Sequence, residues 1–241
     1  MKITLAEIPF GSIQGEGNTT GKISTFIRFS KCNFRCTWCD SKHTWNENKD
    51  TIVYSDENHL IEDNKKLLGQ NNNIVFTGGE PLLFQEQIVD ISNKLEQLAI
   101  IPFKTTYEIE TNLAISIESL PFIKWCRYKE NSIQFNISPK LQFDYSKVVD
   151  NIKLLNKFNI PFILKFVDEG STETREEILK FITEINFSRE INNGKIFIMP
   201  ECVTREEHIN RFERTIEFCK EYGFNFTART HILLWDKKRR V

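Results

Sequence analysis

The segment Cys32-Asn33-Phe34-Arg35-Cys36-Thr37-Trp38-Cys39 places three cysteines at C-x3-C-x2-C spacing. It comes shortly after the apolar, β-branched run from Ile23 to Phe29, which predicts a buried strand and places the cysteines in the loop that follows it. Such a loop is typical of a four-iron, four-sulfur cluster, because three thiolates leave one iron open to a small-molecule ligand. Such a motif therefore predicts a cluster that binds a small molecule at its open iron.

Two other interpretations of the cysteines remain open at this point. A structural zinc ion could be completed by His43, although such sites usually pair two distant clips and the sequence offers no second clip. The three thiols could also be inert, because free cysteine is among the most buried residue types. Cys126, Cys202 and Cys219 lie far apart in the sequence, and we expect them to be core or half-buried thiols.

Length and composition favour one globular domain that acts on a small molecule. The chain has 241 residues, long enough for a sizeable core, and 32 basic against 33 acidic residues give a net charge of −1. This balance gives no indication of nucleic-acid or membrane binding. The first seven residues lack the apolar core of a signal peptide, and no stretch approaches the roughly 18 apolar residues of a membrane span. We therefore expect a cytoplasmic protein, whose reducing surroundings suit an oxidisable cluster.

Short apolar runs alternate with amphipathic stretches after residue 22. The expected strands are Ile23–Phe29, Asn73–Thr77, Thr106–Glu110, Ile133–Ile137, Pro161–Val167 and Lys195–Met199. The expected helices are His59–Leu68, Gln85–Leu98, Ser116–Trp125, Tyr145–Phe158, Thr174–Asn186 and Arg205–Tyr222. Capping-box spacing marks two helix starts, Thr174 with Glu177 and Thr204 with Glu207. The alternation predicts parallel strands, in a barrel or an open doubly wound sheet, with active residues at the strand ends.

The rest of the chain is expected to be irregular or short. Residues 1–22 form a lead-in rich in Gly and polar residues, residues 46–58 a polar loop near the cysteines, and residues 70–73 a turn. His231 to Trp235 is a late strand-like run, and the basic residues 237–240 are expected to form a solvated terminus. Most of the 20 phenylalanines are expected in the core.

Polar motifs stand at several of the expected strand ends. In Gly78-Gly79-Glu80, the glycines let the backbone approach a ligand and the carboxylate suits a protonated amine. Glu108 and Glu110 alternate onto one face of a strand, where a charged pair must line the ligand end of the sheet or bind a cation. Glu16, between two glycines, can accept two parallel hydrogen bonds from a guanidine-like edge. Without further context, a chain reversal and a solvated glutamate in a surface turn explain these motifs too.

The order of these motifs resembles a known enzyme family. The cysteines, with an aromatic residue before the last of them and Thr77-Gly78-Gly79-Glu80-Pro81 downstream, resemble the radical S-adenosylmethionine (radical SAM) enzymes. More narrowly, Gly11-Ser12-Ile13-Gln14-Gly15-Glu16-Gly17, Phe26-Ile27-Arg28 and Asp40-Ser41 resemble the 7-carboxy-7-deazaguanine synthase family. The resemblance runs in order to His231, so it covers nearly the whole chain.

The resemblance implies an α/β fold, a partial six-stranded TIM-like barrel that forms one radical SAM domain over residues 1–241. It implies a carbon–nitrogen lyase that converts 6-carboxy-5,6,7,8-tetrahydropterin to 7-carboxy-7-deazaguanine with loss of ammonia, in queuosine-precursor (7-deazapurine) biosynthesis. A 4Fe-4S cluster would cleave SAM to a 5′-deoxyadenosyl radical, which takes hydrogen from C6 of the pterin and later recovers it. A flavodoxin-type electron donor and a homodimer are also implied.

The resemblance carries specific roles onto residues of this chain. The cluster ligands would be Cys32, Cys36 and Cys39. The cofactor would be held by Trp38, Gly78, Gly79, Glu80, Glu110, Thr111, Asn112, Ser138, Pro139, Lys140, Met199 and Pro200. The pterin would be held by Gln14, Glu16, Arg28 and His231. Ser41 would ligate a magnesium ion that also binds the substrate carboxylate, and this ion keeps several waters in its shell.

The chain departs from the family at three places. Ser41 stands where members usually carry Thr, and keeps the hydroxyl donor. Leu113 follows Glu110-Thr111-Asn112 where members carry Gly, which weakens the cofactor assignment of that segment. The basic tail replaces a Gly-containing one, and we assign no role to Val241.

Two rival functions share some of these features. A glycyl-radical activating enzyme has the same cluster and Gly-Gly-Glu-Pro motif but acts on a protein backbone, and the segment around Glu16 together with His231 argues against it. A zinc-binding module without enzymatic activity would explain the cysteines alone. Metal content and colour separate the second rival, since an iron cluster is brown and zinc is colourless.

Overall fold

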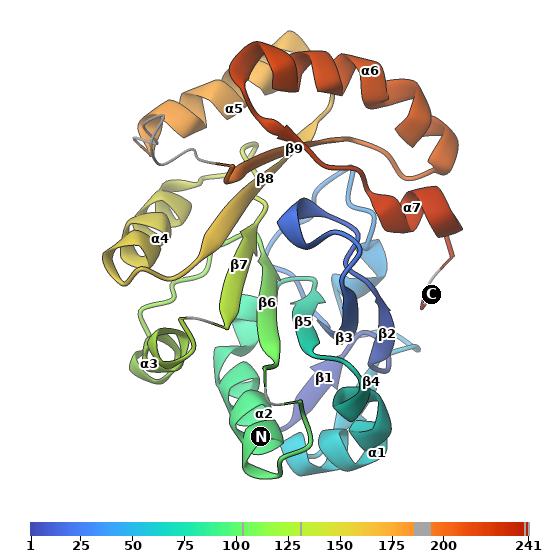
Figure 1. Ribbon diagram of the computed structural model, residues 1–241, viewed down its shortest axis with the longest axis vertical. Coiled ribbons are helices and arrows are strands. Elements are labelled where there is room, and N and C mark those ends of the chain that lie inside the picture. The colour runs from blue at the N-terminus through green and yellow to red at the C-terminus, as the bar shows by residue number, and fades with distance from the viewer. Residues whose placement is uncertain (103, 131, 186–193, 239, 241) are drawn as a thin grey trace.

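The computed structural model describes residues 1–102, 104–130, 132–185, 194–238 and 240, and within them ten strands form one sheet (Figure 1). The strands are β1 (Ile3–Leu5), β2 (Phe10–Ile13), β3 (Ile23–Phe29), β4 (Ile52–Tyr54), β5 (Asn73–Gly78), β6 (Thr106–Thr111), β7 (Ile133–Ile137), β8 (Phe162–Asp168), β9 (Ile196–Pro200) and β10 (Asn225–Phe226). Their order is β10-β9-β8-β7-β6-β5-β3-β1-β4, and β2 pairs with β3.

Six strands, β3 and β5 to β9, are mutually parallel neighbours and confirm the predicted partial barrel. Their residues are mostly buried on both faces, as in β5, which explains why they read as continuous apolar runs. The sheet does not close, because β10 ends it on one side and β4 on the other.

Helices cover the outer face of the curved sheet (Figure 1). The α-helices are α1 (Glu57–Gln70), α2 (Gln85–Gln97), α3 (Leu120–Tyr128), α4 (Ser146–Lys157), α5 (Thr172–Glu184), α6 (Arg205–Tyr222) and α7 (Thr230–Trp235). Short 3-10 turns are η1 (Gly17–Thr19), η2 (Lys42–Thr44) and η3 (Pro81–Phe84). Thr204 and Glu207 form the predicted capping box at the start of α6. No helix in the described ranges is long and apolar enough to cross a membrane.

Three segments that the sequence analysis treated as irregular or strand-like differ in the structure. Residues 1–22 contain β1 and β2, and β2 pairs with β3 from Phe10 to Ile13. Residues 46–58 contain β4, which pairs with β1, and the start of α1. The run His231 to Trp235 lies in helix α7. These strands have three or four residues and lie at the sheet margin, so they carry too little periodicity to be recognised.

Three helix starts also differ from the prediction by more than one residue, and the first is that of α1, which begins at Glu57 instead of His59. Helix α5 begins at Thr172 with Ser171 as its N-cap, so Thr174 occupies the third helical position and makes no capping box with Glu177. The Ser171 hydroxyl accepts a hydrogen bond of 3.1 Å from the backbone amide of Thr174. Helix α3 begins at Leu120 instead of Ser116. The expected end of α5 at Asn186, like Arg239 and Val241, lies outside the described residues.

The segment after β2 fills the inside of the curved sheet. Figure 1 shows this blue segment, which includes η1, within the arc of the strands. Gly17 has φ +76°, which strains any residue with a side chain, and a Cβ on it would lie 2.7 Å from the end of the Ile163 side chain of β8, so glycine favours this approach. The Gly17 amide donates to the Thr227 hydroxyl at 2.8 Å, just beyond β10. Residues 14–22, between β2 and β3, therefore form an interior plug that brings Gln14 and Glu16 to the ends of the strands.

Leu113 adopts the left-handed backbone conformation that glycine adopts most easily, with φ +58°. Its side chain is fully buried in the hydrophobic core, and its amide donates to the Thr111 hydroxyl at 2.8 Å. The Leu113 carbonyl accepts a hydrogen bond of 2.9 Å from the side-chain amide of Asn151. The departure from Gly therefore keeps the turn and adds a core side chain.

Replacing Leu113 by Gly is expected to destabilise the protein despite relieving this backbone. Loss of a buried leucine costs about 3 to 5 kcal/mol, whereas the left-handed conformation costs an L-residue about 1 to 2 kcal/mol. We predict a net loss of about 2 kcal/mol in the free energy of unfolding, measured by urea denaturation. The control is Ala99→Gly, at an exposed site with φ +49°, which is expected to gain up to about 1 kcal/mol. A Leu113→Gly protein as stable as the parent would contradict this account.

Candidate active site

A cavity of about 720 Å³ lies where the parallel strands end. Sixteen of the residues predicted from the sequence line it: Gln14, Glu16, Arg28, Cys32, Cys36, Trp38, Cys39, Ser41, Gly78, Gly79, Glu110, Thr111, Asn112, Lys140, Met199 and His231. Four others, Glu80, Ser138, Pro139 and Pro200, are not among the lining residues. The structure thus brings together motifs that are separated by more than 200 positions in the sequence.

The cysteine loop is held in shape by Arg35. Its guanidinium donates to the carbonyls of Cys32 and Phe34 at 2.7 and 2.8 Å, and to the Asn46 side chain at 2.8 Å. The Phe34 ring stacks on Phe143, from the segment after β7, with ring centroids 4.3 Å apart. Arg35 thus ties the start of the loop to Asn46, which follows the loop, and Phe143 packs against the Phe34 ring.

The three thiols are free and lie at the cavity wall, with Cys36 buried and Cys32 and Cys39 half-buried. Backbone amides point at two of the sulfurs: that of Phe34 lies 3.4 Å from Cys32 Sγ and that of Ser41 3.4 Å from Cys39 Sγ. Burial raises the pKa of Cys32 and Cys36, so ionising them requires positive charge nearby, such as that of bound iron. Three thiols with amides directed at sulfur fit an iron–sulfur cluster.

A preformed site for a single metal ion is not found among the described residues. No group of three or more His, Cys, Asp or Glu side chains within them is gathered closely enough to hold one.

Gly78 and Gly79 bring the end of β5 against the cysteine loop. A Cβ on Gly78, which has φ +132°, would lie 2.1 Å from the Phe29 carbonyl oxygen, and one on Gly79 would lie 2.2 Å from that of Lys31. The Gly79 amide donates to Phe29 at 3.2 Å and the Glu80 amide to Lys31 at 2.9 Å. The glycines are therefore required for chain packing as well as for the cavity wall they form.

Glu80 joins two strand ends. Its carboxylate is fully buried and accepts hydrogen bonds from the Thr111 hydroxyl at 2.6 Å and from the amides of Asn112 and Leu82 at 2.8 and 3.0 Å. Burial raises the pKa of Glu80. The Asn112 side chain in turn donates to Asn33 of the cysteine loop at 2.8 Å. Glu80 thus orients Thr111 and Asn112, which line the cavity.

Lys140 approaches the cysteine loop from the segment after β7. Its ammonium lies 4.8 Å from the centre of the Trp38 ring, in cation–π range, and donates to the Ser138 hydroxyl at 3.0 Å. Burial lowers the pKa of Lys140. Met199 is buried near the end of β9 and also lines the cavity.

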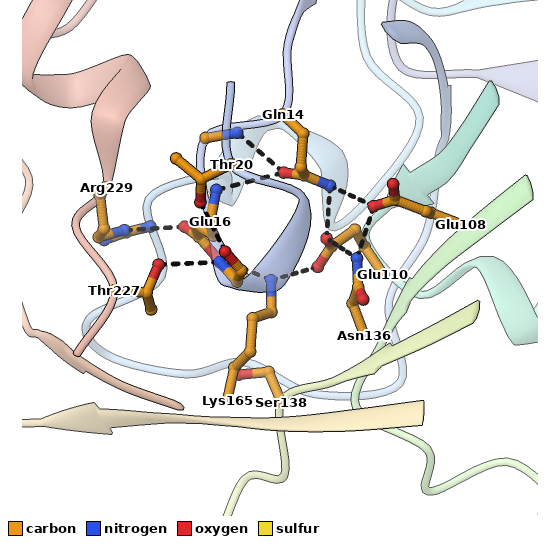
Figure 2. A network of polar contacts seen from close by, with 12 residues as sticks. Gln14, Glu16, Thr20, Glu108, Glu110, Asn136, Ser138, Lys165, Thr227 and Arg229 are labelled. Atoms are coloured by element: carbon orange, nitrogen blue, oxygen red, sulfur yellow. Dashed lines mark hydrogen bonds and ion pairs between the residues drawn. The ribbon is translucent and has the colours of Figure 1, made fainter. Parts of the chain in front are cut away.

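Glu108 and Glu110 share one face of β6, as predicted, and side-chain amides bridge them (Figure 2). Gln14 donates to both carboxylates, at 2.8 and 3.0 Å, and Asn136 does the same at 2.8 Å to each. Only Glu110 reaches the cavity. Burial raises the pKa of Glu110.

Glu16 is paired with two cations that sequence reasoning missed. One carboxylate oxygen accepts from Lys165 Nζ at 2.9 Å and the other from Arg229 Nε at 3.1 Å (Figure 2). Burial alone would raise its pKa, but Lys165, Arg229 and His231 hold the pKa of Glu16 well below its usual value. Lys165 also donates to Glu110 at 2.6 Å. A lysine inside the apolar run of β8 was a usable signal, because lysine is rarely buried without a partner.

Arg229 connects Glu16 to the cysteine loop. Its guanidinium forms an ion pair with Asp40, which follows Cys39, and donates to the Cys202 carbonyl at 2.7 Å. The backbone amide of Arg229 donates to His208 Nε2 at 2.6 Å, so α6 fixes its position. No sequence pattern marks this arginine, which lies in a short loop before α7.

Arg28 and His231 complete this side of the cavity. Arg28 Nε donates to Glu7 at 2.8 Å, and Arg240 of the basic tail pairs with the other Glu7 oxygen at 3.0 Å. His231 packs so closely on Gly15 that a Cβ there would lie 2.2 Å from its Nδ1. Burial lowers the pKa of His231 to about 4, so its imidazole is neutral at pH 7.

Comparison with known proteins gives a consistent result. A family model described as "4Fe-4S single cluster domain" matches residues 13–124. The chain is 30% identical to the 7-carboxy-7-deazaguanine synthase of Clostridium acetobutylicum over 96% of each chain. It is 28% identical to that of Pyrobaculum aerophilum, over 99% of this chain and 97% of the relative.

Solved structures agree in fold. QueE from Escherichia coli superposes with a TM-score of 0.68 at 20% identity, over 96% of this chain and 95% of that one. This likeness concerns the fold, and it matches the open α/β barrel described above. The 30% identity to the Clostridium acetobutylicum synthase over 96% of each chain shows that the chain belongs to the 7-carboxy-7-deazaguanine synthase family.

Proposed function

We propose that this chain is a radical SAM enzyme that converts 6-carboxy-5,6,7,8-tetrahydropterin to 7-carboxy-7-deazaguanine with release of ammonia, in 7-deazapurine biosynthesis. The observation that carries the proposal is that one cavity joins the cysteine loop to Glu16, Arg28 and His231. Family membership favours this function over a glycyl-radical activating enzyme and over a zinc-binding module. We further propose that the chain is one domain, works in the cytoplasm as a homodimer, and takes its electron from a flavodoxin-type donor.

Cys32, Cys36 and Cys39 would hold the cluster, and the strand-end motifs from Gly78 to Pro200 would hold SAM beside it. When bound, the cluster and SAM supply the 5′-deoxyadenosyl radical that takes hydrogen from C6 of the pterin. The protein's part is to orient the two reactants and exclude water, for which a cavity at the end of a buried sheet is suited. Glu80 would act mainly through Thr111 and Asn112, which it orients.

Glu16 would receive the donor edge of the pterin ring. A carboxylate accepts about four hydrogen bonds, so its pairs with Lys165 and Arg229 are compatible with two more from a pterin. Its lowered pKa keeps it ionised and therefore a strong acceptor. Neutral His231 can donate or accept on the same side, while Arg28 adds positive charge.

Ser41 would ligate magnesium at the substrate carboxylate. Its hydroxyl lies at the cavity and donates to Asp40 at 2.8 Å, so a hydroxyl and a carboxylate stand together where the cysteine loop ends. Oxygen donors of this kind suit magnesium. The ion would fix the orientation of the substrate and bias its rearrangement.

The cluster assignment predicts that Cys36→Ala abolishes both iron binding and turnover. After anaerobic reconstitution the parent protein is expected to carry about four iron atoms per chain and to form the deazapurine, detected by mass, with SAM, dithionite and magnesium. Cys126→Ala is the matched control, because Cys126 is a buried free thiol of α3 outside the cavity lining. Full iron content in the Cys36 variant would remove the assignment.

The substrate assignment predicts that Glu16→Gln weakens pterin use and spares the cluster. Hydrogen bonds to a charged acceptor are worth about 1.5 to 3 kcal/mol, so KM for the pterin is expected to rise about 10- to 100-fold. Steady-state kinetics measure the effect, with iron content unchanged. Glu177→Gln, at an exposed position of α5, is the control. An unaltered pterin KM in the Glu16 variant would refute its role.

The magnesium assignment predicts that Ser41→Ala shifts the magnesium dependence. Removing one ligand is expected to raise the magnesium concentration for half-maximal rate about tenfold, as read from titrations at saturating pterin. Ser41→Thr keeps the hydroxyl and should behave like the parent. The assignment fails if the alanine variant titrates with magnesium as the parent does.

A further inference from the structure

Lys165 stands out as a buried charge whose two carboxylate partners line the cavity. Its side chain is 1% exposed and points from β8 between Glu16 and Glu110 (Figure 2). Burial alone would lower its pKa, but the two carboxylates outweigh burial and raise the pKa of Lys165. The ammonium is therefore charged at every working pH, and its two partners both line the cavity.

The three charged groups come from three separate segments of the chain. Glu16 belongs to the interior plug, Glu110 to β6 and Lys165 to β8. One ammonium thus fastens the plug to the inside of the sheet at the point where the pterin would bind. Arg229 holds the other oxygen of Glu16, so the orientation of this carboxylate is fixed by two cations on opposite sides.

The charges around Glu16 make Lys165 decisive for its ionisation. The charged groups that face Glu16 are Glu110 of β6, which opposes its ionisation, and Lys165, Lys140 and Arg229, which favour it. Burial keeps His208, His231 and Cys202, which also face it, uncharged near pH 7. Without Lys165, Glu16 and Glu110 would remain close together with no ammonium between them. Two such carboxylates tend to share one proton, and a protonated acid is a weaker acceptor.

We propose that Lys165 is a positioning residue for the substrate, which holds Glu16 at the cavity wall as a carboxylate ready to accept the donor edge of the pterin. This inference rests on the proposed function and deepens it. A role in stability alone explains Lys165 and its two glutamates less well, because buried ion pairs are often replaceable by apolar side chains without loss of stability. Here both glutamates, Glu16 and Glu110, line the cavity.

The test is equilibrium binding of 6-carboxy-5,6,7,8-tetrahydropterin to the reconstituted protein with SAM and magnesium, without reductant, so that no turnover occurs. Anaerobic dialysis at pH 8, 7 and 6 gives the ratio of each variant's Kd to that of the parent. Lys165→Met is expected to weaken binding about tenfold at pH 8, with iron content unchanged. The ratio should rise further toward pH 6, since losing the cation raises the pKa of Glu16 and protonation increases as pH falls.

Two further variants separate positioning from general damage. Lys165→Arg keeps the cation and should bind within about threefold of the parent. Lys129→Met removes another buried lysine paired with a glutamate, Glu96, outside the cavity lining, and should leave the Kd within about twofold. Should Lys165→Met not fold, Lys165→Gln replaces it, because it keeps a polar side chain without the positive charge, and the same tenfold weakening at pH 8 is expected.

The inference stands only if the Kd of Lys165→Met is much larger than that of the parent, if this ratio rises toward pH 6, and if Lys165→Arg binds nearly as the parent does. A ratio that is flat with pH, or that Lys129→Met reproduces, overturns it, and so does an unchanged Kd. If Lys165→Gln is the variant used, unchanged binding overturns it equally. Failure of the parent protein to bind the pterin would overturn the proposed function itself, and the inference with it.

Discussion

The ammonium of Lys165, held between Glu16 and Glu110, is the contact on which the architecture of the cavity depends. An open barrel leaves an interior that must be filled, and here the segment after β2 fills it with polar groups. Gln14 and Asn136 bridge the carboxylates of β6, while Lys165 and Arg229 anchor Glu16. Buried polar groups of this kind are tolerated only when they are paired, and the network meets that condition for each of these carboxylates.

A second set of contacts holds the cysteine loop. Some of its residues, such as Gly78, Gly79 and Glu80, belong to a motif that would otherwise be assigned directly to ligand binding. Gly78 and Gly79 let β5 pack against the chain beyond β3, and Glu80 ties that end to β6. Arg35 fixes the loop from within. Arg229 then connects the two sets of contacts through Asp40 and Glu16, so the cluster loop and the pterin side of the cavity share one set of ion pairs.

The sequence predicts those parts of the fold that carry a strong local pattern. The six parallel strands are buried on both faces and read as apolar runs, and the cysteine spacing and strand-end motifs mark the cavity. The sequence does not predict the short elements at the sheet margin. Strands β1, β2 and β4 are too short to show alternation, and α7 has only six residues. Lys165 was visible as a charge in an apolar strand, but its partners depend on tertiary contacts with the plug. Arg229 lies in a loop, where local sequence carries no information on pairing.

The central claim is that the protein binds a pterin in this cavity, rearranges it by radical chemistry and regenerates SAM. The most direct measurement is the number of deazapurine molecules formed per SAM consumed, counted by mass spectrometry during anaerobic turnover of the reconstituted parent protein. The account predicts many products per SAM, with little 5′-deoxyadenosine accumulating. Cleavage of SAM without deazapurine, or one 5′-deoxyadenosine released for every product, would contradict it.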